Sequence, residues 1–181
     1  MLHLKNITVD NPKTAGQCQL TKQYGITWLF SEDGKNWYEE QKNFASDTIK
    51  IVYTGDGRVV WVGKDVTGIE PRNASVIEVP DITANRRITA PGYWFYRDDK
   101  FIFDYKLKAE DERDALLKQV SIMTCEWEKD LLLGLISNED REKLKAYRIY
   151  AKSLQAMDFS TITDKTSYNA IEWPVSPEAS S

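Results

Sequence analysis

The residues of this chain that could carry out chemistry are few and widely spaced. His3 is the only histidine, so a Ser-His-Asp or Cys-His catalytic arrangement would have to form at the N-terminus. Zinc ligands occur as clustered pairs of Cys and His, whereas Cys18 and Cys125 are the only cysteines and lie far apart in the sequence. We therefore predict that His3 is an exposed residue near the first strand, and that the chain uses no metal and no cofactor.

Two further patterns are compatible with catalysis but have simpler explanations. Gly55-Asp56-Gly57 lacks the additional glycines, the Lys-Ser/Thr pair and the following helix of a phosphate loop, so it predicts a hairpin turn. Glycoside hydrolases use two carboxylates, but each acid in a predicted loop also suits a turn. These acids are Asp33, Asp56, Asp81, Asp98 and Asp99. An enzyme is therefore not predicted, and a hydrolase is kept only as a third hypothesis.

The charge pattern argues against nucleic acid as a partner. The net charge is −4 and the basic residues are dispersed, unlike the clustered Lys/Arg surface that phosphate binding needs. Arg86-Arg87 is the only arginine pair. It suits either a grip on an acidic partner or sugar phosphate, or a solvated loop.

The termini and hydropathy predict where the chain works. Residues 1–6 contain no apolar core of signal-peptide length, and no apolar run approaches the ~20 residues of a membrane span. We predict a protein of the cytoplasm with no membrane span. Cys18, in a predicted strand, and Cys125, in a predicted helix, are then expected as reduced thiols, although the sequence itself permits a disulfide.

Residues 1–105 predict an antiparallel β domain. Short apolar runs alternate with turn signals such as Ser31 to Gly34, Gly55 to Gly57 and Asp98-Asp99. The predicted strands lie within 26–30, 37–38, 48–53, 58–62, 76–79, 93–96 and 101–103. In residues 48–53, Ile49, Ile51 and Tyr53 are expected to share one face.

Residues 106–158 predict a helical hairpin, with a domain boundary near Asp104 to Ala109. Gly134 is the expected C-cap of the first helix, and Ser137 with Asp140 the N-cap of the second. Two apolar stripes have helical spacing: Leu116, Val120, Met123, Trp127 and Leu131, then Leu144, Tyr147, Ala151 and Leu154. Residues 159–181 predict an extended tail, disordered at its end. The fold class is thus α+β.

Aromatic residues are the unusual feature of the composition, with six Trp and nine Tyr, and interfaces favour such rings. Trp28, Trp61 and Trp127 are predicted core, and Trp173 is expected to dock on the protein's own surface. Adjacent strand residues point to opposite faces, so each aromatic run should leave a ring to be covered by the helices, covered by a partner, or exposed. The candidate partner-binding residues are Trp37, Tyr38, Tyr93, Trp94, Tyr96, Arg86 and Arg87.

Several residue strings are similar to the tail fibre assembly family of tailed phages and prophages, with Mu-like phage proteins the nearest in appearance. The most specific is Trp28-Leu29-Phe30-Ser31-Glu32-Asp33-Gly34-Lys35-Asn36-Trp37-Tyr38. Further similar strings are 4–6, 19–21, 44–53, 76–81, 92–94 with 98–100, 137–150 and 173–174. The resemblance spans nearly the whole chain.

The resemblance implies a chaperone. Proteins of this family bind the C-terminal region of their cognate trimeric tail fibre and help it to trimerise, and some stay on the fibre tip and influence recognition of host lipopolysaccharide. The physical need is clear, because intertwined β structure from three chains forms slowly and exposes unpaired strand edges. We expect the β half to bind the fibre, while the oligomeric state stays open.

Three hypotheses follow from the sequence. The first is the fibre chaperone. The second is a carbohydrate-binding module that presents exposed Trp37 or Trp94 to host surface glycan. The third is a small hydrolase, which requires two converging carboxylates with a raised pKa on one of them. If Trp37 anchors a fibre interface, Trp37→Ala should weaken binding by more than ~1 kcal/mol.

Overall fold

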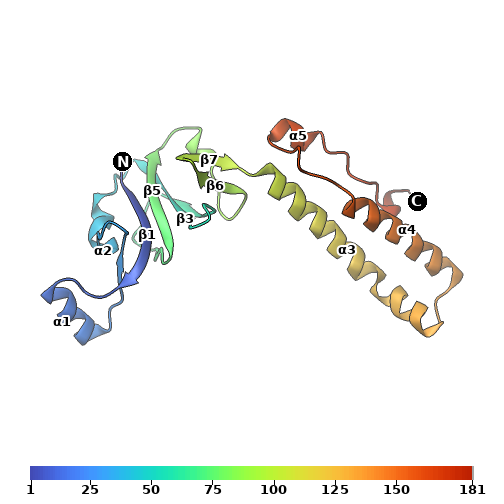
Figure 1. Cartoon of the computed structure of the whole chain (residues 1–181), viewed down its shortest axis with the longest axis horizontal. Coiled ribbons are helices and arrows are strands. Elements are labelled where there is room, and N and C mark those ends of the chain that lie inside the picture. Colours follow the sequence, from blue (N-terminus) through green and yellow to red (C-terminus); the bar gives the residue numbers. More distant parts are fainter. Residues whose placement is uncertain (181) are drawn as a thin grey trace. The chain divides into compact units, whose positions relative to one another are not determined.

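The chain forms two compact units in a computed structural model that describes residues 1–180. Unit 1 runs from Met1 to Phe103, and unit 2 begins at Asp104. Unit 1 is a sheet with short helices, and unit 2 is helical (Figure 1). The predicted α+β class is confirmed.

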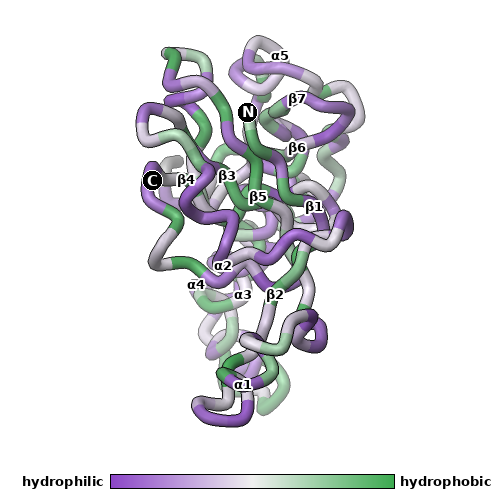
Figure 2. The backbone as a smooth tube through the Cα atoms, turned by 90° about the vertical axis from the view of Figure 1, so that its left-hand side faces the viewer, coloured by the Kyte–Doolittle hydropathy of each residue, from purple (hydrophilic) through white to green (hydrophobic). Residues whose placement is uncertain are grey.

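Unit 1 is built on a five-stranded antiparallel sheet. Its strands are β1 (His3–Asp10), β2 (Trp28–Phe30), β3 (Thr48–Thr54), β4 (Val59–Gly63) and β5 (Ala74–Pro80), in the order β2-β1-β5-β3-β4. A second, two-stranded sheet pairs β6 (Trp94–Arg97) with β7 (Lys100–Phe103). The central strands β3 and β5 are hydrophobic along most of their length (Figure 2), because they carry core residues on both faces.

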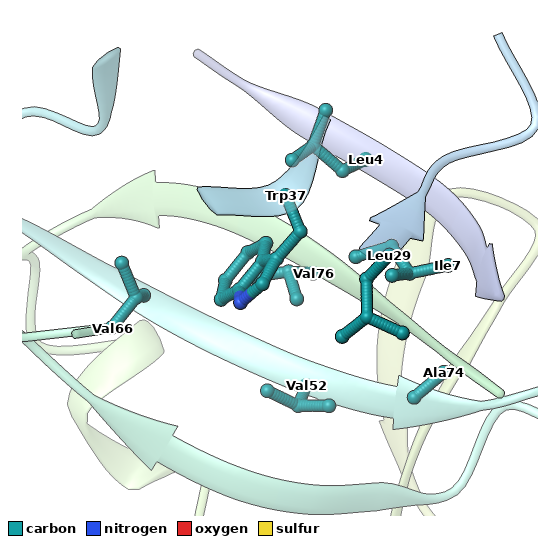
Figure 3. Packing of buried hydrophobic residues seen from close by; sticks show 8 residues of the cluster. All are labelled: Leu4, Ile7, Leu29, Trp37, Val52, Val66, Ala74 and Val76. Carbon is teal, nitrogen blue, oxygen red and sulfur yellow. The ribbon is translucent and has the colours of Figure 1, made fainter. Parts of the chain in front are cut away.

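Alternating residues of the central strands fill two separate cores. On one face lie Leu4, Ile7, Leu29, Trp37, Val52, Val66, Ala74 and Val76 (Figure 3). On the other lie Ile49, Ile51, Val59, Val79 and Ile88. Adjacent Ile51 and Val52 therefore serve opposite cores, as the period of a strand requires. The second core supports the β6–β7 hairpin, because Trp94 and Phe101 pack against it.

The turn between β3 and β4 is the predicted hairpin at residues 55–57. Thr54 N donates to Arg58 O at 3.0 Å, and Gly57 has φ +89°, in the left-handed region that favours glycine. A Cβ at Gly57 would collide with the backbone carbonyl of Tyr96. Glycine is therefore required here both by the turn and by the close approach of β6.

Two segments of unit 1 differ from the prediction. Cys18 lies in α1 (Ala15–Tyr24), not in a strand, because Thr14 caps the helix start and Gly25 ends it with φ +66°. Trp37 and Tyr38 open α2 (Trp37–Glu40), not a strand, because Asn36 accepts from Tyr38 N and Glu39 N. Two short 3₁₀ helices follow in the chain, η1 (Gln41–Asn43) and η2 (Asn85–Arg87).

Unit 2 begins with the predicted helical hairpin, α3 (Tyr105–Leu133) and α4 (Asn138–Gln155). Helix α3 starts at Tyr105, within the predicted boundary at residues 104–109, since the Asp104 side chain accepts from Leu107 N at 2.9 Å. The predicted caps between the helices are confirmed. Gly134 has φ +71°, and Ser137 accepts from Asp140 N.

The two predicted stripes of the hairpin differ in outcome. All four stripe residues of α4 are buried: Leu144, Tyr147, Ala151 and Leu154. On α3, Val120 is buried, but Met123 is 40% and Leu131 45% exposed. The elements that pack against α3 therefore cover only part of its apolar stripe, and Met123 and Leu131 stay largely exposed.

The tail is less extended than predicted. It contains α5 (Lys165–Asn169), whose start is a capping box of Asp164 and Ser167, and the 3₁₀ helix η3 (Pro177–Ser180). Trp173 packs against the hairpin core and lies 5.7 Å from the ring of Phe159, so the predicted docking on the protein's own surface is confirmed. The predicted disorder at the very end includes Ser181, which lies outside the described residues.

Candidate functional site

Unit 1 contains a groove of about 790 Å³ that brings together several predicted partner-binding residues. We call it the aromatic groove. Three segments form its walls: the N-terminal residues 1–3, the loop of η2, and the β6–β7 hairpin, with β5 behind them. Its lining includes three of the candidates, Arg87, Trp94 and Tyr96.

The rings of the groove come from alternate positions of the hairpin. Trp94 and Tyr96 share one face of β6, and Phe101 lies opposite Tyr96 in the register of β7. The Tyr96 and Phe101 rings are 5.0 Å apart, and Tyr96 also stands 4.7 Å from Tyr53 on the large sheet. Such close ring pairs add interaction energy to that gained from burial, and so hold the hairpin against β3.

His3 joins this network, which corrects the prediction that it is an exposed residue. It is half-buried in β1, with Nε2 2.6 Å from the hydroxyl of Tyr53 and its ring edge-on to Tyr96 at 5.7 Å. Burial, followed by the charge of Lys5, lowers the pKa of His3 below 6.5. The imidazole is therefore neutral at pH 7 and acts as a hydrogen-bonding group of the groove wall.

The Tyr96 hydroxyl is held in its neutral, donating form. It donates to Asp99 Oδ1 at 3.0 Å. Burial, that hydrogen bond and the charge of Asp99 raise the pKa of Tyr96 to about 12. The groove thus combines flat rings with a phenol donor, a neutral imidazole and the exposed charges of Arg87, Asp99 and Lys100.

A buried carboxylate fixes the N-terminal wall of the groove. Glu78 in β5, only 5% exposed, accepts from Leu2 N at 2.9 Å, Ala45 N at 2.6 Å and the Thr48 hydroxyl at 2.7 Å. Burial acts to raise the pKa of Glu78, but these hydrogen bonds and the charge of Lys50 together lower it below 4.5. The carboxylate is therefore a structural clamp between β5, residues 45–48 and the N-terminus.

The adjacent residues Arg86 and Arg87 have different surroundings. Arg86 Nε donates to Asp81 Oδ1 at 2.7 Å, and Lys64 Nζ lies 2.7 Å from the other oxygen of the same carboxylate. The hydrogen bonds from Arg86 and then Lys64 lower the pKa of Asp81 to about 2. Arg86 is thus engaged within the protein, whereas exposed Arg87 lines the groove.

Trp37 does not lie at the surface, so the expectation of an exposed Trp37 is wrong. Its side chain is 0% exposed, and its Nε1 donates to Ile69 O at 3.3 Å. The signal for this was present in the sequence. Asn36 precedes Trp37 as a helix cap, and Glu39 and Glu40 suit the first turn of a helix.

Tyr38 and Tyr93 lie outside the groove lining. Tyr38 is 40% exposed and stands edge-on to Trp28 at 6.1 Å, in a separate hollow with Glu70 and Arg72. Tyr93 is half-buried against Phe103, with ring centroids 5.9 Å apart. The structure therefore gathers Arg87, Trp94 and Tyr96, and separates them from the other candidates.

The groove residues that sequence reasoning missed are His3, Phe101 and Lys100. His3 contacts Tyr53, fifty positions away in the chain, through a pairing of strands that no local pattern marks. Within residues 1–180, no three His, Cys, Asp or Glu side chains are grouped to hold a metal ion, and no helix is long and apolar enough to cross a membrane. Cys18 and Cys125 are free and exposed.

Comparison with known proteins gives the family. Residues 39–178 match the family model described as Caudovirales tail fibre assembly protein, lambda gpK. The chain belongs to the tail fibre assembly protein family. The match begins immediately after the Trp28 to Tyr38 string and includes the hairpin of the aromatic groove, the helical hairpin and the tail.

Individual members of the tail fibre assembly family match over most of their length. The chain is 48% identical to tail fiber assembly protein U' of Escherichia phage Mu and 45% identical to U' of Escherichia phage P1, in each case over 90% of this chain and 95% of the relative. It is 40% identical to tail fiber assembly protein U of phage Mu, over 98% of this chain and the whole of the relative.

Proposed function

We propose that this protein is an assembly chaperone for a phage tail fibre. It binds the C-terminal region of its cognate trimeric fibre in the bacterial cytoplasm and promotes folding and trimerisation, without catalysing a reaction. The observation that carries this proposal is membership of the tail fibre assembly family, whose matched segment spans residues 39–178. The names of the Mu and P1 relatives describe the same assembly role for those proteins.

The aromatic groove supports binding through unit 1. Rings with a polar atom at one end give large contact areas at low entropy cost, and such residues dominate the binding energy of interfaces. The proposed contact residues are Trp94, Tyr96 and Arg87 in the groove, with Tyr38, Tyr93 and Arg86 outside it. Trp37 is withdrawn as a direct contact because it is buried.

Co-expression tests the assembly role. The C-terminal segment of the cognate fibre is produced with and without this protein, and soluble SDS-resistant trimer and co-purification are measured. We expect soluble trimer only in the presence of this protein. A fibre segment that trimerises equally well alone and does not associate with this protein refutes the proposal.

A matched pair of variants tests the groove. Trp94→Ala should weaken the complex by ~2 kcal/mol or more if its ring is an interface anchor. Tyr24→Ala, which changes a ring 67% exposed on α1, is the control and should bind as the wild type does. Equal binding of both folded variants refutes the role of Trp94 but leaves the assembly role standing.

We also propose that the protein stays on the fibre tip and influences binding of host lipopolysaccharide. The second candidate function, a carbohydrate-binding module, now depends on Trp94, since Trp37 is buried. The mixture of rings and polar groups in the groove favours it. Isothermal titration of purified protein with lipopolysaccharide oligosaccharide tests both ideas. Binding without fibre supports the module, binding only by the fibre complex supports the tip role, and no binding by either refutes both.

The hydrolase hypothesis receives no support from the groove. It requires a carboxyl with a raised pKa, whereas the buried carboxyl of the groove, Glu78, has a lowered pKa and accepts three hydrogen bonds within the protein.

A further inference from the structure

Strand β7 is an open edge beside the aromatic groove. On one side it pairs with β6, and β6 in turn reaches the β3–β4 turn through Tyr96 N, which donates to Gly57 O at 2.7 Å. Within the described part of unit 1, no strand pairs with the other side of β7. Proteins usually guard such edges with charges, proline or bulges. Here Lys100 is followed by Phe101, Ile102 and Phe103, and Ile102 is 46% exposed.

The geometry of the hairpin sets which backbone groups face the open side. Asp98 and Asp99 both have positive φ, 49° and 57°, as in a two-residue type I′ turn. In such a hairpin the flanking pair, Arg97 and Lys100, is hydrogen-bonded, and pairs alternate from there. Tyr96 and Phe101 are then a non-bonded pair whose N–H and C=O groups point outward.

The observed hydrogen bonding agrees with this assignment. Tyr96 N points away from β7 and donates to Gly57 O. By the same alternation, the N–H and C=O of Phe101 point to the open side of β7. The ring of Phe101 meanwhile lines the aromatic groove. Phe101 therefore offers backbone groups for strand pairing on the open side of β7, while its ring forms part of the groove wall.

We propose that β7 accepts an extended segment of a fibre chain as an added β-strand, hydrogen-bonded to the backbone of Phe101. This inference rests on the proposed function. Backbone hydrogen bonds hold the segment, while every second side chain lies along Tyr96 and Phe101 in the groove and gives specificity. The opposite side chains lie beside exposed Ile102. The segment that fits is a strand with apolar residues at alternate positions, such as a fibre strand not yet paired in the trimer.

Two substitutions at one position separate the backbone from the ring. Phe101→Ala removes the ring and keeps the N–H, whereas Phe101→Pro removes both. Proline is tolerated where the N–H of an edge strand faces outward, so the hairpin bonds are retained. We expect the proline variant to bind the co-expressed fibre segment about tenfold more weakly than the alanine variant, from the lost hydrogen bond and the steric block. Equal affinities overturn the proposal.

Hydrogen exchange of the wild-type protein gives a test that needs no variant. In the complex with the fibre segment, the Phe101 amide should exchange more slowly by about tenfold or more. The Ile102 amide, already bonded to β6 in the hairpin, is the internal reference. If the complex forms but the Phe101 amide exchanges as fast as in the unbound protein, strand addition is refuted and the assembly role is not. Failure to form any complex with the fibre segment refutes the proposed function itself.

Discussion

The aromatic groove of unit 1 and the tip of the helical hairpin in unit 2 both expose apolar side chains, but in different ways. At the groove, rings are half-buried and fixed by contacts between β1, β3, β6 and β7. At the tip, Leu132 is 87% exposed, and Leu133 and Leu135 are each 71% exposed. The tip residues lie beside the αL turn at Gly134 that ends α3.

The difference shows that exposure of a large side chain is not evidence of a built site. The groove rings have hydrogen-bonded or stacked neighbours that fix their positions, as a preorganised surface needs. The tip leucines gain little from folding and should contribute little to stability. The two regions therefore differ in how much each side chain contributes to the stability of its own unit. Mutation can measure this contribution.

The largest expected effect is from Trp37→Ala in the core of unit 1. Removal of the indole leaves a cavity that the neighbouring side chains cannot fully close. The free energy of unfolding of unit 1 should therefore fall by ~3–5 kcal/mol. Urea denaturation followed by tryptophan fluorescence measures this. The adjacent exposed Tyr38→Ala is the control, with a loss below ~1 kcal/mol. A similar loss for both variants would mean that the surface position assigned to Tyr38 is wrong.

Next in size is Leu154→Ala in unit 2. Leu154 is 0% exposed in the hairpin core, so its truncation should cost ~2–5 kcal/mol. Leu132→Ala, at the tip, should change stability by less than ~0.5 kcal/mol. Thermal unfolding followed by far-ultraviolet circular dichroism compares the two. A large loss from Leu132→Ala would show that the tip is packed and would remove the contrast with the groove.

Glu78→Gln should change how the stability of unit 1 depends on pH. The folded pKa of Glu78 lies below its ordinary 4.5, so its stabilising contribution is complete above pH 4.5 and is lost as pH falls through the folded pKa. The variant should cost ~1–3 kcal/mol at pH 7 and lose part of the acid dependence. Denaturation midpoints at pH 7 and at pH 3 test this. An unchanged acid dependence contradicts the clamp.

The smallest expected effect is from Tyr96→Phe. Because the folded pKa of Tyr96 is raised from 10.0 to about 12, its contribution to stability is present below pH 10 and is lost between pH 10 and 12. The variant should lose ~1 kcal/mol or less at pH 7, for one hydrogen bond at the surface. Ultraviolet titration of the tyrosines should lose its highest step. Retention of that step would assign it to another tyrosine.

The sequence by itself determined the features that depend on near neighbours. The turn at residues 55–57, the stop at Gly134, the cap at Ser137 and the buried stripe of α4 all follow from local spacing and from the few residues that suit each backbone geometry. The two segments wrongly expected as strands, around Cys18 and at Trp37-Tyr38, also carry local helix caps, Thr14 and Asn36, which the strand expectation did not take into account.

Only the tertiary structure decided which aromatic residues form a surface. Burial of Trp37 depends on β1, β3 and β5 meeting over it, and the network of His3, Tyr53 and Tyr96 joins residues up to ninety-three positions apart in the chain. The open edge of β7 likewise depends on the sheet order, which side-chain periodicity does not encode. A strand's period tells which residues share a face, but the neighbouring strands that cover that face are set by contacts far away in the sequence.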